Sequence, residues 1–359
     1  MKRGPSRYVG AGDRPIFIGA CPRSGTTLLR TMLNTHPDIA IPRETKFVPI
    51  LWEHRAEWRG LDSESVRERL ARTIAETSWT RADRFATPMD ELVKRLVDAP
   101  PTLGSMFGTC FQLYAEATGK WRWGDKRPMY ARYMDGVFSL FPDAQFINCI
   151  RDPRASMASM RKIGWYDGKV APGLDLWERS VRAVDPWRRV LHADQLIDLR
   201  YEDLVGAPQS ALSTLADYLT LSQDSVPAML NYQDNVDETS MRYHSRLSEP
   251  ITTDTVRSWE ETLTADEVAL VEHVAGPWMD AFGYERTAAG ARPPAALLED
   301  YQQRRREVAT VRRELEIEEF KRMFICREPV AARLTAAQQR VTGRPDLPPF
   351  WKRHLGKPR

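Results

Sequence analysis

The stretch IFIGACPRSGTTLLRTML, residues 16–33, constrains the fold of this chain more than any other segment. An apolar run of strand length breaks into a polar turn, and a helical pattern follows at once. The first backbone N–H groups of a helix lack partners within the helix, and the helix dipole adds positive potential there. A strand, a tight turn and a helix in this order therefore predict an anion-binding loop.

The turn is similar to the phosphate loop of kinases and ATPases but differs from it at two positions. Their pattern, G-x-x-x-x-G-K-[ST], places a lysine at the outer phosphates and a hydroxyl on magnesium. Here Ala20 replaces the first glycine and Thr26 replaces the lysine. The apolar strand FINCIRDP also ends in Arg-Asp rather than in a lone metal-binding aspartate. The loop should bind a phosphate. It lacks the lysine, and the strand FINCIRDP lacks the lone aspartate, that support metal-assisted transfer of a γ-phosphoryl group.

Four side chains or backbone positions of the loop suit an anion. Gly25 lets the backbone approach closely. Arg23 supplies a charged fork, and Thr26 and Thr27 supply hydroxyl donors. The alternative for the two threonines is capping of the helix that follows, which is compatible with binding.

A second constellation lies in INCIRDPRASMASM, residues 147–160. Arg151 leaves a strand end, and Ser159 follows eight residues later in the next helix. An arginine with a hydroxyl suits a terminal phosphate, because the guanidinium fork matches two oxygens. The alternative is a surface pair of Asp152 with Arg151 or Arg154. Together the two constellations require a nucleotide with two separate anionic ends, the shape of adenosine 3'-phosphate 5'-phosphosulfate (PAPS).

The apolar runs predict an α/β fold. Continuous short runs at 16–20, 145–150 and 196–201, separated by helical stretches, indicate a P-loop-type parallel sheet flanked by helices. We expect an N-terminal tail at 1–14 and a main domain at 15–286. We also expect a tryptophan-rich helical insertion at about 50–120, with helices at 63–76 and 89–97, whose rings either shape a pocket or fill the core.

The C-terminal part is predicted to be a linker and a basic helical extension, residues 287–359. Before it, Thr264 and Glu267 form a capping box for a helix that we expect to end at the sequence AGPW. The extension begins with an Ala/Gly/Pro-rich linker and continues as a charged helix over 296–323. A weak heptad stripe on that helix could pack on the body or form a homodimer: Tyr301, Val308, Val311 and Leu315.

Composition and charge limit the kinds of partner and the compartment that the chain can be predicted to have. Residues 287–359 hold 16 Lys and Arg against 9 Asp and Glu, a net charge of +7, which leaves −4 for the rest of a chain whose total is +3. The basic tail either forms a solvated helix face or contacts another molecule, and the body is not basic enough to predict nucleic-acid binding. The four scattered cysteines indicate reduced thiols. With no apolar run of membrane length and no recognisable signal peptide, the sequence predicts a cytoplasmic protein.

The joint occurrence of these motifs resembles the PAPS-dependent sulfotransferase family over about residues 15–285. PRSGTTLL is similar to the family's 5'-phosphosulfate loop, which implies donor contacts from Arg23, Ser24, Gly25, Thr26 and Thr27. RDPRASMAS is similar to its 3'-phosphate element, with Arg151 and Ser159 at the family's spacing. LRYEDLV and VRSWEETLT are familiar from its bacterial members. Tyr201 of the former is expected at the donor site, where it would pack against or position other groups.

Within the family, residues 22–49 are most similar to tyrosylprotein sulfotransferases. The resemblance implies that Glu44 of RETK is the general base and that Lys126 of GDKRP, with Arg23, supports the transferring sulfuryl group. Considered alone, Glu44 could instead pair with Arg43 or Lys46, and Lys126 with Asp125. Those enzymes are usually membrane-anchored in a secretory compartment, whereas this chain shows no anchor.

The late donor contacts of the family have no firm counterparts in this chain. Alignment on Pro250 places Tyr243 and Ser258 at those positions, with Ser245 and Arg257 nearby as the candidates that we retain.

The resemblance implies transfer of a sulfuryl group from PAPS to the hydroxyl of a small molecule or peptide. The products are the sulfated acceptor and adenosine 3',5'-bisphosphate, and no metal is needed. A carboxylate base favours a phenolic acceptor, because a phenol with a pKa near ~10 loses its proton more easily than an aliphatic alcohol. The alternatives are a P-loop kinase of a small molecule and an inactive nucleotide-binding interaction protein.

Overall fold

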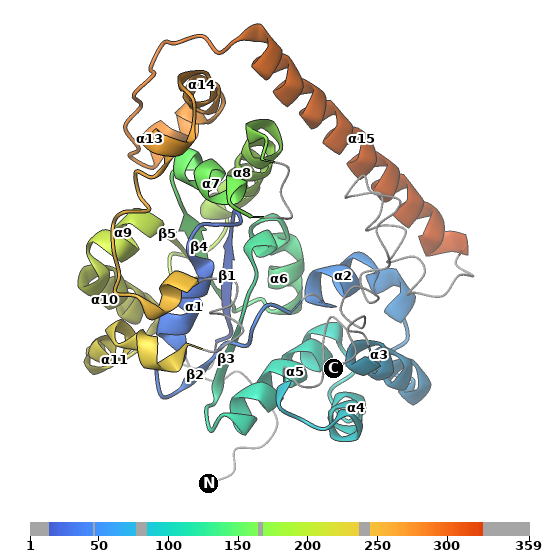
Figure 1. Ribbon diagram of the computed structural model, residues 1–359. Helices are drawn as coiled ribbons and strands as arrows, with labels where there is room; N and C mark the ends of the chain where they lie inside the picture. Colours follow the sequence, from blue (N-terminus) through green and yellow to red (C-terminus); the bar gives the residue numbers. More distant parts are fainter. Residues whose placement is uncertain (1–13, 46, 77–84, 164–167, 237–244, 326–359) are drawn as a thin grey trace, which may run out of the picture. The chain divides into compact units, whose positions relative to one another are not determined.

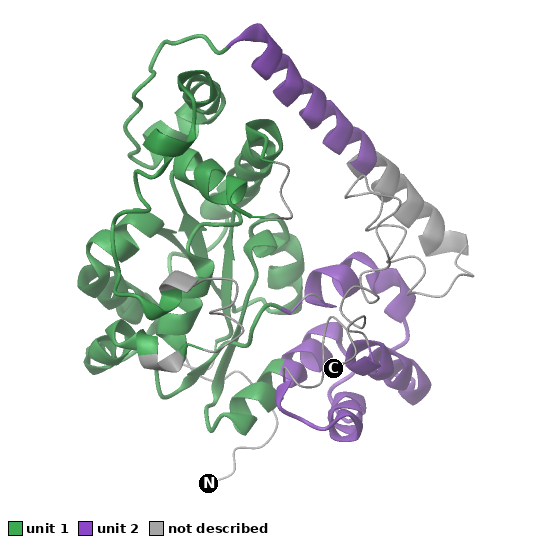
Figure 2. Cartoon of the chain, in the orientation of Figure 1, with its two compact units in different colours: residues 1–44, 111–293 green, residues 45–110, 294–359 purple. Residues whose placement is uncertain are grey.

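The structure is a computed structural model of the 359-residue chain, and it describes residues 14–45, 47–76, 85–163, 168–236 and 245–325. The chain divides into two compact units (Figure 2). The first comprises residues 1–44 and 111–293, and the second comprises residues 45–110 and 294–359.

A five-stranded parallel sheet forms the centre of the first unit, with the strand order β2-β3-β1-β4-β5 (Figure 1). The strands are β1 Ile16–Ala20, β2 Ile39–Ala40, β3 Arg122–Lys126, β4 Gln145–Ile150 and β5 Leu196–Arg200. The parallel sheet and its three apolar strands are therefore confirmed, except that the third ends at Arg200 because Tyr201 begins helix α9, Tyr201–Gly206. β1 and β4 are neighbours, so the loops that follow them leave the same edge of the sheet.

Strands β2 and β3 were not predicted. β3 has the sequence RWGDK, which lacks an apolar run, yet all five residues are buried. Its first residue, Arg122, is 1% exposed and donates hydrogen bonds to the Leu219 carbonyl at 2.6 Å and to Gln145 Oε1 at 2.5 Å. Satisfied hydrogen bonds therefore allow a charged residue inside the sheet, where the apolar pattern gives no signal.

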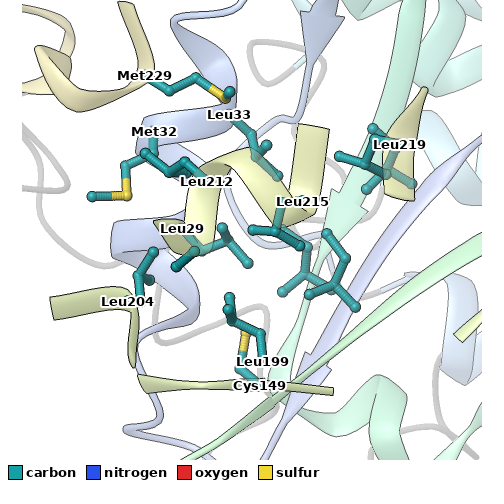
Figure 3. Close-up of a cluster of buried hydrophobic side chains, with 14 of the residues drawn as sticks. Leu29, Met32, Leu33, Cys149, Leu199, Leu204, Leu212, Leu215, Leu219 and Met229 are labelled. Carbon is teal, nitrogen blue, oxygen red and sulfur yellow. The ribbon is translucent and has the colours of Figure 1, made fainter. Parts of the chain in front are cut away.

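Helices on one face of the sheet enclose a continuous apolar cluster (Figure 3). Ile16 and Ile18 of β1 belong to it, together with Leu29 and Leu33 of α1 and Leu215 of α10. The helices that contribute are α1 Thr26–Asn34, α9, α10 Pro208–Leu219 and α11 Val226–Leu230. This packing fixes the start of α1 against the sheet, and hence the position of the loop before it.

Aromatic rings pack on the opposite face, because side chains alternate along a strand. Phe17 of β1 lies 5.2 Å from Tyr130 and 5.3 Å from Phe141 between ring centroids.

The remaining elements of this unit follow β3, β4 and β5 along the chain. They are η4 Pro128–Arg132, α6 Met134–Leu140, α7 Pro153–Arg161, α8 Val170–Val184, η5 Asp185–Arg189, η6 Gln223–Ser225, η7 Tyr232–Asn235, η8 Ser245–Ser248, α13 Trp259–Thr262 and α14 Ala265–Ala281.

Helix α14 confirms the capping box and corrects the predicted helix end. The Thr264 side chain accepts from the Glu267 N–H, and Glu267 accepts from the Thr264 N–H at 2.9 Å. The helix continues through Pro277 to Ala281 rather than ending at AGPW. A proline inside a helix costs about 3 kcal/mol. The fully buried residues Val271, Ala275 and Met279 on this helix offset that cost through apolar burial.

The second unit is helical. The predicted helices at 63–76, 89–97 and 296–323 are confirmed to within two residues, and Phe47 packs its ring 5.3 Å from that of Phe107 between centroids. Among the tryptophans of the segment 50–120, whose rings were expected to shape a pocket or fill the core, Trp58 is 2% exposed and lies in the core. The elements are α2 Phe47–Glu53, η2 Arg55–Trp58, α3 Glu64–Glu76, α4 Met89–Val97, the first half of α5 Leu103–Ala117, and α15 Ala295–Ile325.

Burial of the cysteines gives a test of the fold. Cys21, Cys110 and Cys149 are free and at most 4% exposed, and burial raises the pKa of the Cys21 and Cys149 thiols to about 12. At pH 8 their thiolate fraction should be roughly a thousandfold below that of an ordinary cysteine. We expect these three to resist iodoacetamide in the native protein and to react fully in urea, as read by peptide mass spectrometry. Equal labelling under both conditions would contradict the fold.

Candidate active site

The loop between β1 and α1 has an unusual backbone. Gly25 is the N-cap of α1 in the left-handed region, with φ at 81°, and Arg23 has φ at 72°. A non-glycine residue in this region is strained by about 1–3 kcal/mol and is typical of functional sites. A Cβ at Gly25 would lie 2.4 Å from the ring of Tyr201, so only glycine fits between that ring and the helix start.

Two hydroxyls of the loop are buried at the start of α1. Ser24 is 1% exposed and Thr26 is 5% exposed. The Ser24 Oγ has no hydrogen-bond partner among the described residues. Leaving a buried hydroxyl unsatisfied costs about 1–3 kcal/mol, so this atom points to a ligand at the loop.

The second anion element begins where β4 ends. Asp152 caps α7 by accepting from the Arg154 N–H at 2.8 Å, and its carboxylate also pairs with the Arg154 guanidinium at 2.7 Å. Arg154 pairs in addition with Glu272 at 2.7 Å. The Arg154–Asp152 pair that we weighed as an alternative therefore exists, although it is buried. It leaves Arg151 to face the loop after β1.

The two elements meet through hydrogen bonds between residues far apart in the sequence. Arg23 Nε donates to Ser159 Oγ at 3.0 Å, and Arg151 Nη1 donates to the Arg23 carbonyl at 2.8 Å. The Arg151 guanidinium lies over the ring of Tyr201, 4.3 Å from its centroid. The structure thus brings together the four predicted residues Arg23, Arg151, Ser159 and Tyr201.

Positive charge is concentrated and desolvated at this junction. Arg151 is 5% exposed, and burial lowers its pKa. The pKa of Arg23 is lowered by burial and then by the neighbouring charge of Arg151. The Arg151 Nε is buried and has no hydrogen-bond partner among the described residues. Two adjacent guanidiniums, the buried one of Arg151 and the partly buried one of Arg23, with an unsatisfied donor on Arg151 form a site for an anion.

The predicted catalytic pair is also assembled. Lys126 Nζ donates to Glu44 Oε1 at 2.6 Å and to Thr27 Oγ1 at 3.3 Å. The Lys126 side chain is 4% exposed and that of Glu44 is 42% exposed. Asp125, the alternative partner, accepts instead from the Lys126 backbone N–H and from the Tyr130 hydroxyl. The ammonium group therefore faces Glu44, while Lys46 lies outside the described residues.

Among the late candidate residues, the structure describes the side chains of Arg257 and Ser258. The Arg257 side chain is 73% exposed, and its Nε donates to Glu260 at 2.7 Å. Ser258 donates to the Thr255 carbonyl at 3.3 Å. Ser245 begins the short helix η8, but its side chain lies outside what the structure describes, as does all of Tyr243.

Two residues of the site were not predicted from the sequence. The Trp177 indole donates to the Arg151 carbonyl at 3.0 Å, and the Thr255 carbonyl accepts from Arg151 Nη2 at 2.7 Å. Neither lies in a recognisable motif, and Thr255 acts through its backbone. Across the described part of the chain, His, Cys, Asp and Glu form no group of three or more that could hold a metal ion.

Comparison with known proteins adds a family and a fold. A family model described as "Sulfotransferase family" matches residues 15–225. The chain is 24% identical to the protein-tyrosine sulfotransferase of Drosophila melanogaster, over 75% of this chain and 51% of that protein. It is 25% identical to protein-tyrosine sulfotransferase A of Caenorhabditis elegans, over 78% of this chain and 68% of that one. The chain thus spans about half the length of the first relative and two thirds of the second.

Two solved domains share the fold. The sulfotransferase domain of the Synechococcus PCC 7002 olefin synthase matches with a TM-score of 0.54 at 22% identity, over 79% of this chain and 99% of that domain. The sulfotransferase domain from the curacin biosynthetic pathway matches with a TM-score of 0.50 at 22% identity, over 76% and 98%. The predicted P-loop-type fold is therefore confirmed.

The relatives overturn the predicted cytoplasmic location. The matched animal proteins are named protein-tyrosine sulfotransferases. This is the group whose members, as noted for the resemblance of residues 22–49, are usually anchored in a secretory compartment. The prediction rested on missing membrane and signal segments, and such an absence does not determine a compartment. Among the described helices, none is both long and apolar enough to cross a bilayer.

The fit of Gly25 against Tyr201 can be tested by substitution. We expect Gly25→Ala to weaken binding of adenosine 3',5'-bisphosphate by roughly 5- to 150-fold, the equivalent of 1–3 kcal/mol of strain, because the new Cβ must displace the ring or the loop. Isothermal titration calorimetry measures the change.

The matched control is Gly119→Ala. Gly119 also has a positive φ, at 71°, but a Cβ there meets nothing within 4 Å. This variant should lose stability without losing nucleotide affinity. Equal losses of affinity in the two variants would show that the contact with Tyr201 does not shape the site.

Proposed function

This chain belongs to the sulfotransferase family, and we propose that it transfers a sulfuryl group from PAPS to an acceptor hydroxyl. The observation that carries the proposal is the junction of the two anion elements through Arg23, Ser159 and Arg151. One anion-binding element would suit many phosphorylated ligands. Two that meet at one sheet edge favour a nucleotide with phosphate at both ends.

The residues present fit this donor substrate. We assign the 5'-phosphosulfate to the loop residues, whose helix N-terminus and buried Ser24 hydroxyl suit an anion: Arg23, Ser24, Gly25, Thr26 and Thr27. We assign the 3'-phosphate to Arg151 and Ser159, with Tyr201 beneath the guanidinium. The unsatisfied Nε of Arg151 supports this assignment, because a phosphate oxygen would accept from it.

Glu44 and Lys126 supply the chemistry in this proposal. The acceptor oxygen forms a bond to sulfur, the bond from sulfur to the 5'-phosphate oxygen breaks, and the acceptor proton goes to Glu44. Adenosine 3',5'-bisphosphate leaves with the bonding electrons. Lys126 and Arg23 stabilise the charge that develops on the leaving phosphate and the sulfuryl oxygens.

The exposure of the pair suits these roles. The Glu44 carboxylate is 42% exposed and can meet an acceptor from solvent. Lys126 is buried between Thr27 and Glu44, so it is held in place before the reaction.

For the acceptor we propose a phenolic hydroxyl, with a tyrosyl side chain of a peptide or protein favoured. The support is the name that the relatives share and the preference of a carboxylate base for a phenol. A small aromatic acceptor uses the same chemistry. A panel of tyrosyl peptides and simple phenols, assayed with labelled PAPS, separates the two.

We also propose that α15 contributes to a homodimer. Tyr301 of the stripe is 3% exposed, whereas Val308 and Val311 are partly exposed and available to a second chain. Sedimentation of the intact chain and of a variant lacking residues 296–359 tests this. A monomer in both cases would refute it.

The nucleotide preference separates a sulfuryl donor site from a kinase site. We expect adenosine 3',5'-bisphosphate to bind at least about tenfold more tightly than ATP, with no requirement for magnesium, because a charge-assisted contact to the 3'-phosphate adds about 1.5–3 kcal/mol. Calorimetry with and without magnesium measures both affinities. Binding of ATP that equals it, or that depends on magnesium, would favour the kinase alternative.

A further prediction concerns Glu44 as the general base. Glu44→Gln should lower kcat by about 10²- to 10⁴-fold, because the amide cannot take the acceptor proton. Affinity for adenosine 3',5'-bisphosphate should stay within about twofold of the wild type, since Glu44 is assigned no donor contact.

Glu261→Gln serves as the matched control, because Glu261 is exposed on α13 outside the site. It should leave both kcat and nucleotide affinity unchanged. An active Glu44→Gln enzyme would remove Glu44 from the mechanism. If the wild type binds the bisphosphate but transfers no sulfuryl group to any acceptor, the inactive nucleotide-binding alternative is favoured.

A further inference from the structure

Thr255 lies on the segment between η8 and α13, and it contacts two residues of the donor site. Its hydroxyl is 2.7 Å from the Tyr201 hydroxyl, and its carbonyl accepts from Arg151 Nη2 at 2.7 Å. Its own backbone is held by a turn in which the Val256 N–H donates to the Thr253 carbonyl at 2.9 Å. One residue thus fixes both the ring and the guanidinium that lies on it.

The contacts of Arg151 show what this fixation achieves. A guanidinium has five N–H donors in one plane. Nη1 donates to the Arg23 carbonyl and Nη2 to the Thr255 carbonyl, while the ring of Tyr201 supports one face of the plane. Two backbone carbonyls and a ring therefore set the orientation of Arg151. The Nε atom of this guanidinium is buried and has no hydrogen-bond partner among the described residues.

The ring of Tyr201 is restrained at several points. Its edge contacts Gly25 at the start of α1, its face supports Arg151, and its hydroxyl reaches Thr255. A tyrosine ring has two rotatable bonds, so a hydrogen bond at its tip restricts both. Loss of the bond to Thr255 would let the ring tilt away from the guanidinium, and the guanidinium would lose the support for its plane.

We propose that Thr255 is a positioning residue for the 3'-phosphate of the donor, acting through Tyr201 and Arg151. This inference rests on the proposed function, because it takes Arg151 as the group that binds the 3'-phosphate. It adds a residue that lies outside the two motifs and a reason for its side-chain hydroxyl. A competing explanation is that Thr255 only stabilises the turn at residues 253–256.

The experiment uses Thr255→Val, which removes the hydroxyl at nearly constant shape, and Thr255→Ser, which retains it. Calorimetry measures the binding of adenosine 3',5'-bisphosphate and adenosine 5'-phosphate to each full-length variant. Thr255→Val should weaken the bisphosphate by about 3- to 12-fold, the range for one neutral hydrogen bond, and leave the monophosphate within about twofold. Thr255→Ser should bind both as the wild type does.

Tyr201→Phe reaches the same hydrogen bond from the other side and guards against a Thr255 variant that fails to fold. It should show the same selective loss. The double variant Thr255→Val/Tyr201→Phe should lose no more than either single one, because each removes the same bond. In steady-state assays, KM for PAPS should rise in parallel with the loss of bisphosphate affinity, while kcat stays within about twofold.

Three results would overturn the role of Thr255: equal losses for both nucleotides, no rescue by serine, or additive losses in the double variant. A merely structural residue would give the first. A wild type that prefers the 3'-phosphate but transfers no sulfuryl group would refute the proposed function and leave the role of Thr255 intact. A wild type with no preference for the 3'-phosphate would refute both.

Discussion

The buried guanidinium of Arg151 is the contact on which the rest of the site depends. It joins the carbonyl of Arg23 in the loop after β1 to the carbonyl of Thr255, more than 100 residues further along the chain. Burying an arginine without a carboxylate partner is costly, so its donors must be satisfied by other acceptors. Here backbone carbonyls do this, and no described carboxylate forms a direct ion pair with Arg151, although the charges of Glu202 and Asp152 act on it from further away. An anion at the junction therefore gains an attraction that a salt bridge would have cancelled.

The anion loop could be predicted from the sequence because its signals are local. A strand, a glycine with positive φ and a helix start lie within 20 residues, and each follows from residue type. The contact between Arg23 and Ser159 could not be predicted from such local signals. It arises because β1 pairs with β4, and pairing between strands is decided by the whole sheet. The family resemblance, rather than the residue pattern, related the two.

Strand β3 and helix α14 show the limits of local rules. RWGDK is polar at both ends, so no apolar period marks it as a strand, yet neighbours on either side bury it. Pro277 indicates a helix end by local propensity, but the apolar face of α14 continues beyond it and remains buried. In both cases tertiary burial outweighs a local preference of a few kcal/mol. Thr255 could not be predicted from the sequence for a different reason: its contact with Arg151 uses a backbone carbonyl, which every residue type has, and its hydroxyl lies in no recognisable motif.

In the proposed mechanism, Lys126 and Glu44 have different roles and differ in exposure to match. Lys126 is at the end of a buried strand, is 4% exposed, and is anchored by Thr27 as well as by Glu44. Glu44 lies outside regular structure and is 42% exposed. A fixed cation can stabilise developing charge without reorganising, which is the condition under which electrostatic stabilisation is strongest. A base must instead meet acceptors that differ in shape, and the half-exposed carboxylate of Glu44 is accessible to them. The division places rigidity on the donor side and accessibility on the acceptor side.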